Sequence, residues 1–116
     1  MSDFGNIVLV PFPFTDLTAS KVRPALVVSR RGGGPDVIVC FISSKHAPRL
    51  GSAARIDPSP QNGLKVPSVV RFDRIATLDR SIVLGELGRI DRTWLRKNRP
   101  TFFRVFGFWR FDGGGS

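Results

Sequence analysis

The chain has 116 residues, a length that fits one domain with a modest core, and its apolar share of 41% excludes a disordered protein. Eighteen basic residues against nine acidic ones give a formal net charge of +9, which favours a polyanionic partner, nucleic acid before a membrane surface. No apolar run reaches the roughly 18 residues of a membrane-spanning helix, and the first residues lack the features of a signal peptide. A cytoplasmic protein without membrane contact is expected.

The first predicted strand covers residues 7–10 and is buried. Pro11 and Pro13 should end it, because proline cannot donate to a central ladder. The small polar residues 15–20 then form a loop held between two strands, which is a common location for a functional site.

The second predicted strand follows the most informative stretch of the chain, residues 21–29. Pro24 suits the start of a strand, and the residue before a proline is pushed toward extended geometry, which holds Arg23 at the mouth of the strand. Residues 25–28 are all apolar and predict burial on both faces. A guanidinium at the rim of a rigid sheet is well placed to bind phosphate. The alternative is a surface arginine before an ordinary core strand.

The third predicted strand, residues 37–42, contains the single cysteine, Cys40. One cysteine cannot form an internal disulfide or a multi-thiolate metal site, so a core thiol and no metal site are expected. Two hydroxyls, an ammonium and an imidazole leave the end of this strand together, from Ser43, Ser44, Lys45 and His46.

Residues 47–63 form a long connection, either a working loop or a short strand pair around residues 54–56. Strand character resumes in three pieces, residues 68–72, 75–78 and 82–87. Several short strands separated by turns, without alternating helices, predict a small antiparallel barrel or sandwich.

The C-terminal part is predicted to be helical and aromatic. Asp91 can cap a helix that runs to Arg99, and Pro100 either kinks it or starts a new turn. Residues 101–109 are too apolar to face water on a monomer, so they either cap the core or form a subunit contact. Residues 113–116 are expected to be a Gly/Ser tail, which leaves 1–112 as one domain.

Five stretches of the chain together resemble the MazF/PemK family, the toxins of type II toxin–antitoxin modules. They are residues 5–16, 21–29, 42–44, 68–78 and 84–88. The resemblance implies a mainly β fold, a small SH3-like antiparallel β-barrel of the kind shared by MazF, PemK and CcdB, with a C-terminal helical segment. It also implies a homodimer.

The resemblance further implies an endoribonuclease that cuts single-stranded RNA without a metal or other cofactor. Such enzymes are held inactive by a cognate antitoxin protein, and no specific DNA binding by the toxin alone is expected. The family's catalytic arginine precedes a proline at a strand start and corresponds to Arg23. Its catalytic threonine or serine ends the third strand and corresponds to Ser43, with Ser44 as the adjacent candidate.

The chemistry of RNA cleavage agrees with these assignments. The 2′-OH attacks its own phosphate, and a guanidinium offers two parallel donors to the charge that grows on the non-bridging oxygens. Further RNA contacts are expected from Thr15, Asp16, Lys21, Lys45, His46 and Arg71. The general base is not assigned, because the loop before Arg23 offers only Asp16, where some family members have a glutamate. His46 is a second candidate, since imidazole titrates near neutral pH.

Two other functions are open. A toxin of this fold can bind and poison a protein target such as gyrase without catalysis, because a fold does not fix a function. That toxin would depend on the aromatic C-terminal segment. A plain RNA-binding barrel would instead bind RNA with steep salt dependence and no turnover.

Overall fold

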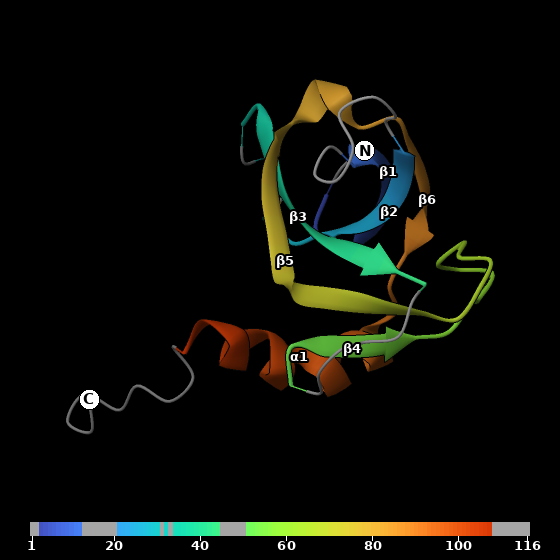
Figure 1. The fold of residues 1–116 in the computed structure, drawn as a ribbon, viewed down its shortest axis with the longest axis vertical. Helices are drawn as coiled ribbons and strands as arrows, with labels where there is room; N and C mark the ends of the chain where they lie inside the picture. Colours follow the sequence, from blue (N-terminus) through green and yellow to red (C-terminus); the bar gives the residue numbers. More distant parts are fainter. Residues whose placement is uncertain (1–2, 13–20, 31, 33, 45–50, 108–116) are drawn as a thin grey trace.

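Figure 1 shows a strongly curled β-sheet, with one long helix beneath it at the C-terminal end. This computed structural model describes residues 3–12, 21–30, 32, 34–44 and 51–107. Its elements are, in order, β1 (Asn6–Phe12), β2 (Lys21–Val27), β3 (Asp36–Ser43), β4 (Ala53–Ile56), β5 (Ser68–Asp79), the 3-10 turn η1 (Arg80–Ile82), β6 (Gly85–Arg89) and α1 (Arg92–Phe106). The strands lie in the order β4-β5-β3-β2-β1-β6, and neighbours are antiparallel. The predicted mainly β fold with a C-terminal helical segment is confirmed.

The prediction that Pro11 ends the first strand is wrong. β1 runs on to Phe12, and Pro11 pairs with Val22 of β2. On its other side, β1 pairs with β6 only from Asn6 to Leu9. Beyond Leu9, β1 is therefore an edge strand, where a residue without an N–H is tolerated.

The two strands predicted within residues 68–78 are one long strand, β5, which bends instead of ending (Figure 1). β5 pairs with β3 on both sides of residues 71–74, and these residues lie opposite the single residue Phe41. Such an insertion is a bulge, which bends the strand and strengthens its twist. The bend lets β5 pair with both β3 and β4 while the sheet curls.

The strand predicted over residues 82–87 begins only at Gly85. The Asp79 carboxylate accepts hydrogen bonds from the backbone N–H and the hydroxyl of Ser81, at 2.8 and 2.6 Å, and caps η1. Because the residues of a 3-10 turn are not extended, β6 cannot start before this turn has ended.

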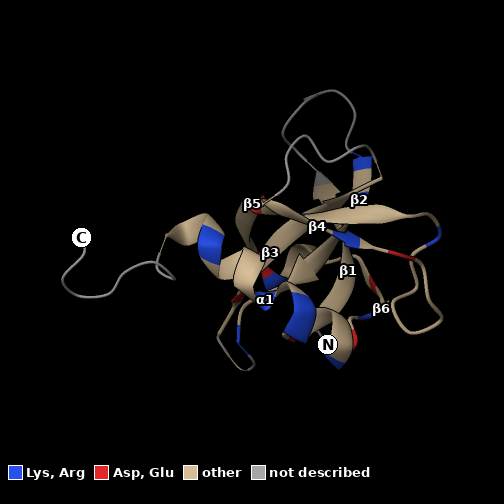
Figure 2. Ribbon diagram, turned by 90° about the horizontal axis from the view of Figure 1, so that it is seen from below, with Lys and Arg blue, Asp and Glu red and all other residues tan. Residues whose placement is uncertain are grey.

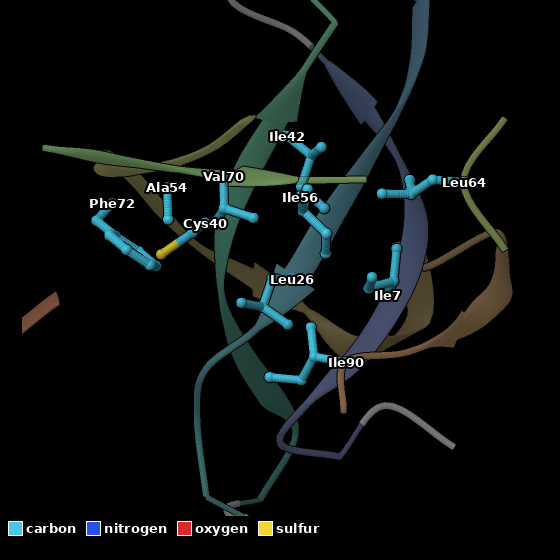
Figure 3. Close-up of a cluster of buried hydrophobic side chains, with 10 residues drawn as sticks. All are labelled: Ile7, Leu26, Cys40, Ile42, Ala54, Ile56, Leu64, Val70, Phe72 and Ile90. Atoms are coloured by element: carbon cyan, nitrogen blue, oxygen red, sulfur yellow. The ribbon is translucent and has the colours of Figure 1, made fainter. Parts of the chain in front are cut away.

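Buried side chains gather on both faces of the sheet. Along β2, Leu26 points to one face while Ala25 and Val27 point to the other, because successive strand residues alternate. The face covered by α1 carries the helix-side cluster (Figure 3), which consists of Ile7, Leu26, Cys40, Ile42, Ala54, Ile56, Leu64, Val70, Phe72 and Ile90. The opposite face carries the valine cluster, which consists of Val8, Val10, Ala25, Val27, Val37, Val39 and Phe41.

Cys40 is a core residue, as predicted. Its side chain is fully buried in the helix-side cluster. Burial, and secondarily the negative charge of Asp73, raises the pKa of the Cys40 thiol to about 12. The thiol is therefore neutral near pH 7 and is not a nucleophile there.

α1 covers the helix-side cluster with aromatic side chains. The Asp91 carboxylate accepts the backbone N–H of Trp94 at 2.6 Å and caps the helix as predicted. Pro100 lies inside the helix and does not end it. The Phe102 ring packs edge-on against Phe72 with centroids 5.5 Å apart, so part of the aromatic segment caps the core. Within the described residues, no helix is both long enough and apolar enough to span a membrane.

The loop after β4 closes the open side of the curled sheet. The backbone N–H of Arg89 in β6 donates to the Gln61 carbonyl at 2.9 Å. A Cβ at Gly88 would collide with that carbonyl, so this close approach requires glycine. The buried Asn62 side chain donates to the Asp57 carbonyl at 2.8 Å and accepts two backbone N–H groups of the loop at 3.0 and 2.9 Å. Asn62 thereby fixes the conformation of the loop that contacts β6.

Candidate functional site

Arg23 lies near the start of β2, on the face of the sheet that carries the valine cluster. Its backbone pairs with Val10 of β1, a member of that cluster. Directly paired residues of antiparallel strands project to the same face, so the Arg23 side chain shares the face of Val10. The Arg23 side chain is half-buried at the end of the sheet where β2 begins.

Ser43, the last residue of β3, projects to the same face. It follows Phe41 of the valine cluster by two residues, and Phe41 pairs with Ala25 of β2. Continuing this antiparallel register by two residues places Arg23 opposite Ser43. Neighbouring strands are about 4.8 Å apart, so the guanidinium and the hydroxyl can reach the same phosphate.

Ser44 and Lys21 flank this pair in different ways. Ser44 is exposed in a bend after β3, and the strand alternation would direct it away from the face of Ser43. Lys21 is exposed at the first position of β2, two residues before Arg23, and therefore lies on the same face. The fold thus groups Lys21 with Arg23 and Ser43, and leaves Ser44 outside the group.

Arg71 of β5 is held by an acidic neighbour. Its Nε and one terminal nitrogen donate to the two carboxylate oxygens of Asp73, at 2.9 and 2.8 Å. This hydrogen bonding lowers the pKa of Asp73 and raises that of Arg71. The Arg71 side chain is only 15% exposed. Arg71 stands between Val70 and Phe72 of the helix-side cluster, so its side chain projects to the face of Arg23, but its charge is largely offset by Asp73.

Arg55 of β4 joins this face, although no motif in the sequence marks it. It stands between Ala54 and Ile56, which are buried in the helix-side cluster, so its own side chain projects to the opposite face. It pairs with Val69 of β5, which in turn pairs with Ser43. The only signal in the sequence is the alternation of exposed and buried residues, and it identifies no site until the strand pairing is known.

Thr15, Asp16, Lys45 and His46 lie outside the described residues. Their expected RNA contacts stay predictions, as do the two candidates for the general base. Among the residues that are described, no group of three or more His, Cys, Asp or Glu side chains could hold a metal ion.

A cavity of about 410 Å³ lies on the other face of the sheet, beneath α1. Its walls are mostly apolar and include Phe4, Leu26, Trp94 and Phe103, with Arg99 as the charged member. Lys and Arg residues occur on β2, β4 and α1 (Figure 2), so positive charge is not confined to the face of Arg23. The two faces therefore differ: the face of Arg23 is polar and basic, and the face covered by α1 is aromatic with basic residues beside it.

Residues 3–99 match the family model described as PemK-like, MazF-like toxin of type II toxin-antitoxin system. The chain belongs to this family. The matched range runs from before β1 into α1 and includes all the described candidate residues on the face of Arg23, from Lys21 to Arg71. No curated protein matches the chain.

Solved structures of MazF toxins have the same fold. The Mycobacterium tuberculosis toxin MazF-mt6 is 22% identical with a TM-score of 0.72, over 88% of this chain and 96% of that chain. A mycobacterial endoribonuclease in complex with its cognate antitoxin is 17% identical with a TM-score of 0.74, over 91% and 95%. MazF from Deinococcus radiodurans is 26% identical with a TM-score of 0.69, over 91% and 96%. The MazF-like fold expected from the sequence is thereby confirmed.

Proposed function

We propose that this MazF/PemK family member is a metal-independent endoribonuclease that cleaves single-stranded RNA at short sequences. The observation that carries the proposal is the convergence of Arg23 and Ser43 on one face, from the start of β2 and the end of β3. Similar structures described as endoribonucleases support it, one of them in complex with its cognate antitoxin.

In this mechanism, the 2′-OH of the nucleotide before the scissile bond attacks the adjacent phosphorus. The 2′-OH gives its proton to water, and the new P–O bond closes a 2′,3′-cyclic phosphate. The bond to the 5′ oxygen breaks, and that oxygen leaves with the bonding electron pair and takes up a proton from water. Arg23 binds the non-bridging oxygens through two parallel donors and offsets the negative charge that grows on them. The Ser43 hydroxyl hydrogen-bonds to the same phosphate and fixes its orientation. DNA lacks the attacking hydroxyl and is not cut.

The proposed partners are an antitoxin and a second copy of the chain. Complexes of MazE with MazF from Deinococcus radiodurans support an antitoxin partner. Phe103 and Phe106 of α1 are 47% and 43% exposed, which offers apolar surface for association.

The test incubates the purified protein with a long single-stranded RNA in EDTA and reads the cut sites by primer extension. We expect discrete cuts by the wild type, loss of about 100- to 1000-fold in rate for Arg23→Ala, and a smaller loss for Ser43→Ala. Arg96→Ala, an exposed arginine of α1, is the charge-matched control. If folded wild type leaves varied RNAs uncut and Arg23→Ala binds them equally well, the proposal is wrong.

The second candidate function is a non-catalytic toxin that poisons a protein target. The exposed Phe103 and Phe106 and the apolar cavity beneath α1 favour it, because large exposed apolar patches mark protein-binding sites. It predicts that growth arrest on expression survives Arg23→Ala and disappears in a Phe103→Ser/Phe106→Ser variant. The endoribonuclease predicts that arrest is lost in Arg23→Ala.

A further inference from the structure

Four residues form one transverse row across the sheet, on the face of Arg23. Ser43 of β3 pairs with Val69 of β5, and Val69 pairs on its other side with Arg55 of β4. The β2–β3 register, continued by two residues, adds Arg23 at the other end of the row. Ser43, Val69 and Arg55 project to one face because they are directly paired. Arg23 projects to the same face because it lies two residues before Ala25 of the valine cluster.

The backbone of Arg55 is held in place, while its charged side chain is accessible to a ligand. Its carbonyl accepts the indole N–H of Trp94 at 2.8 Å, and β4 is paired with β5 along its length. Its side chain is 75% exposed and contacts the Asp57 carboxylate through Nε at 3.2 Å, where Asp57 is 66% exposed. Exposed pairs of this kind contribute little because water screens both charges, so a phosphate can replace the carboxylate.

Arg71 lies next to the row and cannot serve in the same way. Its bidentate bonds to Asp73 and its low exposure leave most of its donors engaged or covered. Of these two arginines at the β4–β5 edge, Arg55 is therefore the one that can bind an incoming anion.

We propose that Arg55 is a second phosphate-binding position, so that single-stranded RNA crosses the strands from β2 to β4 and passes over Val69. Three strand spacings of about 4.8 Å separate Arg23 from Arg55, or about 14 Å. At about 3.4 Å per stacked nucleotide this distance covers about four nucleotides, and fewer in an extended strand. This inference rests on the proposed RNA-cleaving function. It predicts that nucleotides flanking the cut contribute part of the binding energy.

The test compares the wild type, Arg55→Ala, Arg55→Lys and Arg96→Ala in binding a 12-nucleotide 2′-O-methyl RNA, which cannot be cleaved by 2′-OH attack. We expect Arg55→Ala to weaken binding about tenfold, the value of one charge-assisted hydrogen bond. Its slope of log affinity against log salt should fall in magnitude by about 0.7. Arg55→Lys should keep the wild-type slope, and Arg96→Ala should stay within about twofold of wild-type affinity.

Two further measurements separate this role from catalysis. On a long cleavable RNA, Arg55→Ala should raise KM and leave kcat unchanged, since the residue contacts a phosphate that does not react. On a short substrate that ends before the phosphate at Arg55, Arg55→Ala and the wild type should have equal kcat/KM.

The outcomes for Arg55 and for the nuclease are distinguishable. If Arg55→Ala matches Arg96→Ala in affinity and salt slope, the second phosphate position is wrong, even if the wild type cuts RNA. If Arg55→Ala weakens binding but no protein cuts RNA, the phosphate position stands and the proposed nuclease fails.

Discussion

Three arginines on one face differ in what their surroundings allow. Arg71 is largely covered and bound to Asp73, Arg55 is exposed beside an exposed carboxylate, and Arg23 is half-buried near the start of β2. A partly desolvated guanidinium interacts more strongly with an anion than an exposed one, because water screens it less. At the scale of residues, Arg23 is therefore the one suited to stabilise charge during a reaction, and Arg55 the one suited to hold a substrate.

Arg23→Lys tests whether the catalytic contribution comes from charge or from geometry. Lysine keeps the positive charge but loses the planar fork that donates two parallel hydrogen bonds. We expect RNA affinity within about threefold of wild type, because the point charge persists, and a kcat about 10- to 100-fold lower. Single-turnover cleavage of a saturating RNA measures this directly. A kcat equal to that of the wild type would show that charge alone suffices.

At the scale of elements, the Arg71–Asp73 pair stabilises the bend of β5 at residues 71–74. In Asp73→Asn, the free energy of unfolding should decrease less steeply as the pH falls into the acid range than it does in the wild type. The hydrogen bond with Arg71 lowers the pKa of Asp73 in the folded chain, while the unfolded chain binds that proton near pH 3.9. As pH falls from about 5 to the folded pKa, the unfolded state binds more protons and stability decreases.

Urea midpoints at several pH values between about 2.5 and 6 measure how steeply the stability depends on pH. Some decrease should persist in Asp73→Asn, because hydrogen bonds from Ser81 also lower the pKa of Asp79. Identical pH dependence in the two proteins would contradict the assignment of acid sensitivity to the pair.

The closing loop makes a second prediction at this scale. Asn62→Ala removes three hydrogen bonds within the loop, and the backbone N–H of the buried Leu64 loses its partner. We expect a loss of about 1 to 3 kcal/mol in the free energy of unfolding. The neighbouring Gln61→Ala is the control, since that side chain is exposed and only its backbone carbonyl bonds to Arg89. Equal stability of the two variants would mean that Asn62 does not hold the loop.

The sequence predicts the strands and the position of Arg23 because both depend on local properties. Apolar runs mark β1, β2 and β3. The expectation that Pro24 starts its strand is wrong, because β2 begins at Lys21 and Pro24 pairs with Leu9 in its middle. The extended geometry that proline imposes on Arg23 is compatible with either position in a strand. The course of β5 and the role of Arg55 depend instead on pairing between distant residues. Nothing near Arg55 in the sequence indicates that Val69 will stand beside it, because that register is set by the whole loop between them.

At the scale of the molecule, the net charge of +9 should speed association with RNA more than it strengthens the complex. α1 covers the other face of the sheet and carries Arg92, Arg96, Lys97, Arg99 and Arg104 without an acidic residue. These charges attract a polyanion over distances up to about a Debye length, which is about 8 Å at physiological ionic strength. By contrast, Lys21 and Arg55 lie on the proposed path of the RNA and act in the bound state.

Two charge-reduced variants separate these effects. Arg92→Gln/Lys97→Gln/Arg104→Gln should lower the association rate constant severalfold at low salt and leave the dissociation rate constant unchanged, because these residues only steer the encounter. Lys21→Gln/Arg55→Gln should instead raise the dissociation rate constant, because contacts in the complex are lost. Stopped-flow binding of a 2′-O-methyl RNA at several salt concentrations gives both constants. If the α1 variant dissociates faster and the sheet variant does not, the RNA lies along α1, and the path from β2 to β4 is wrong.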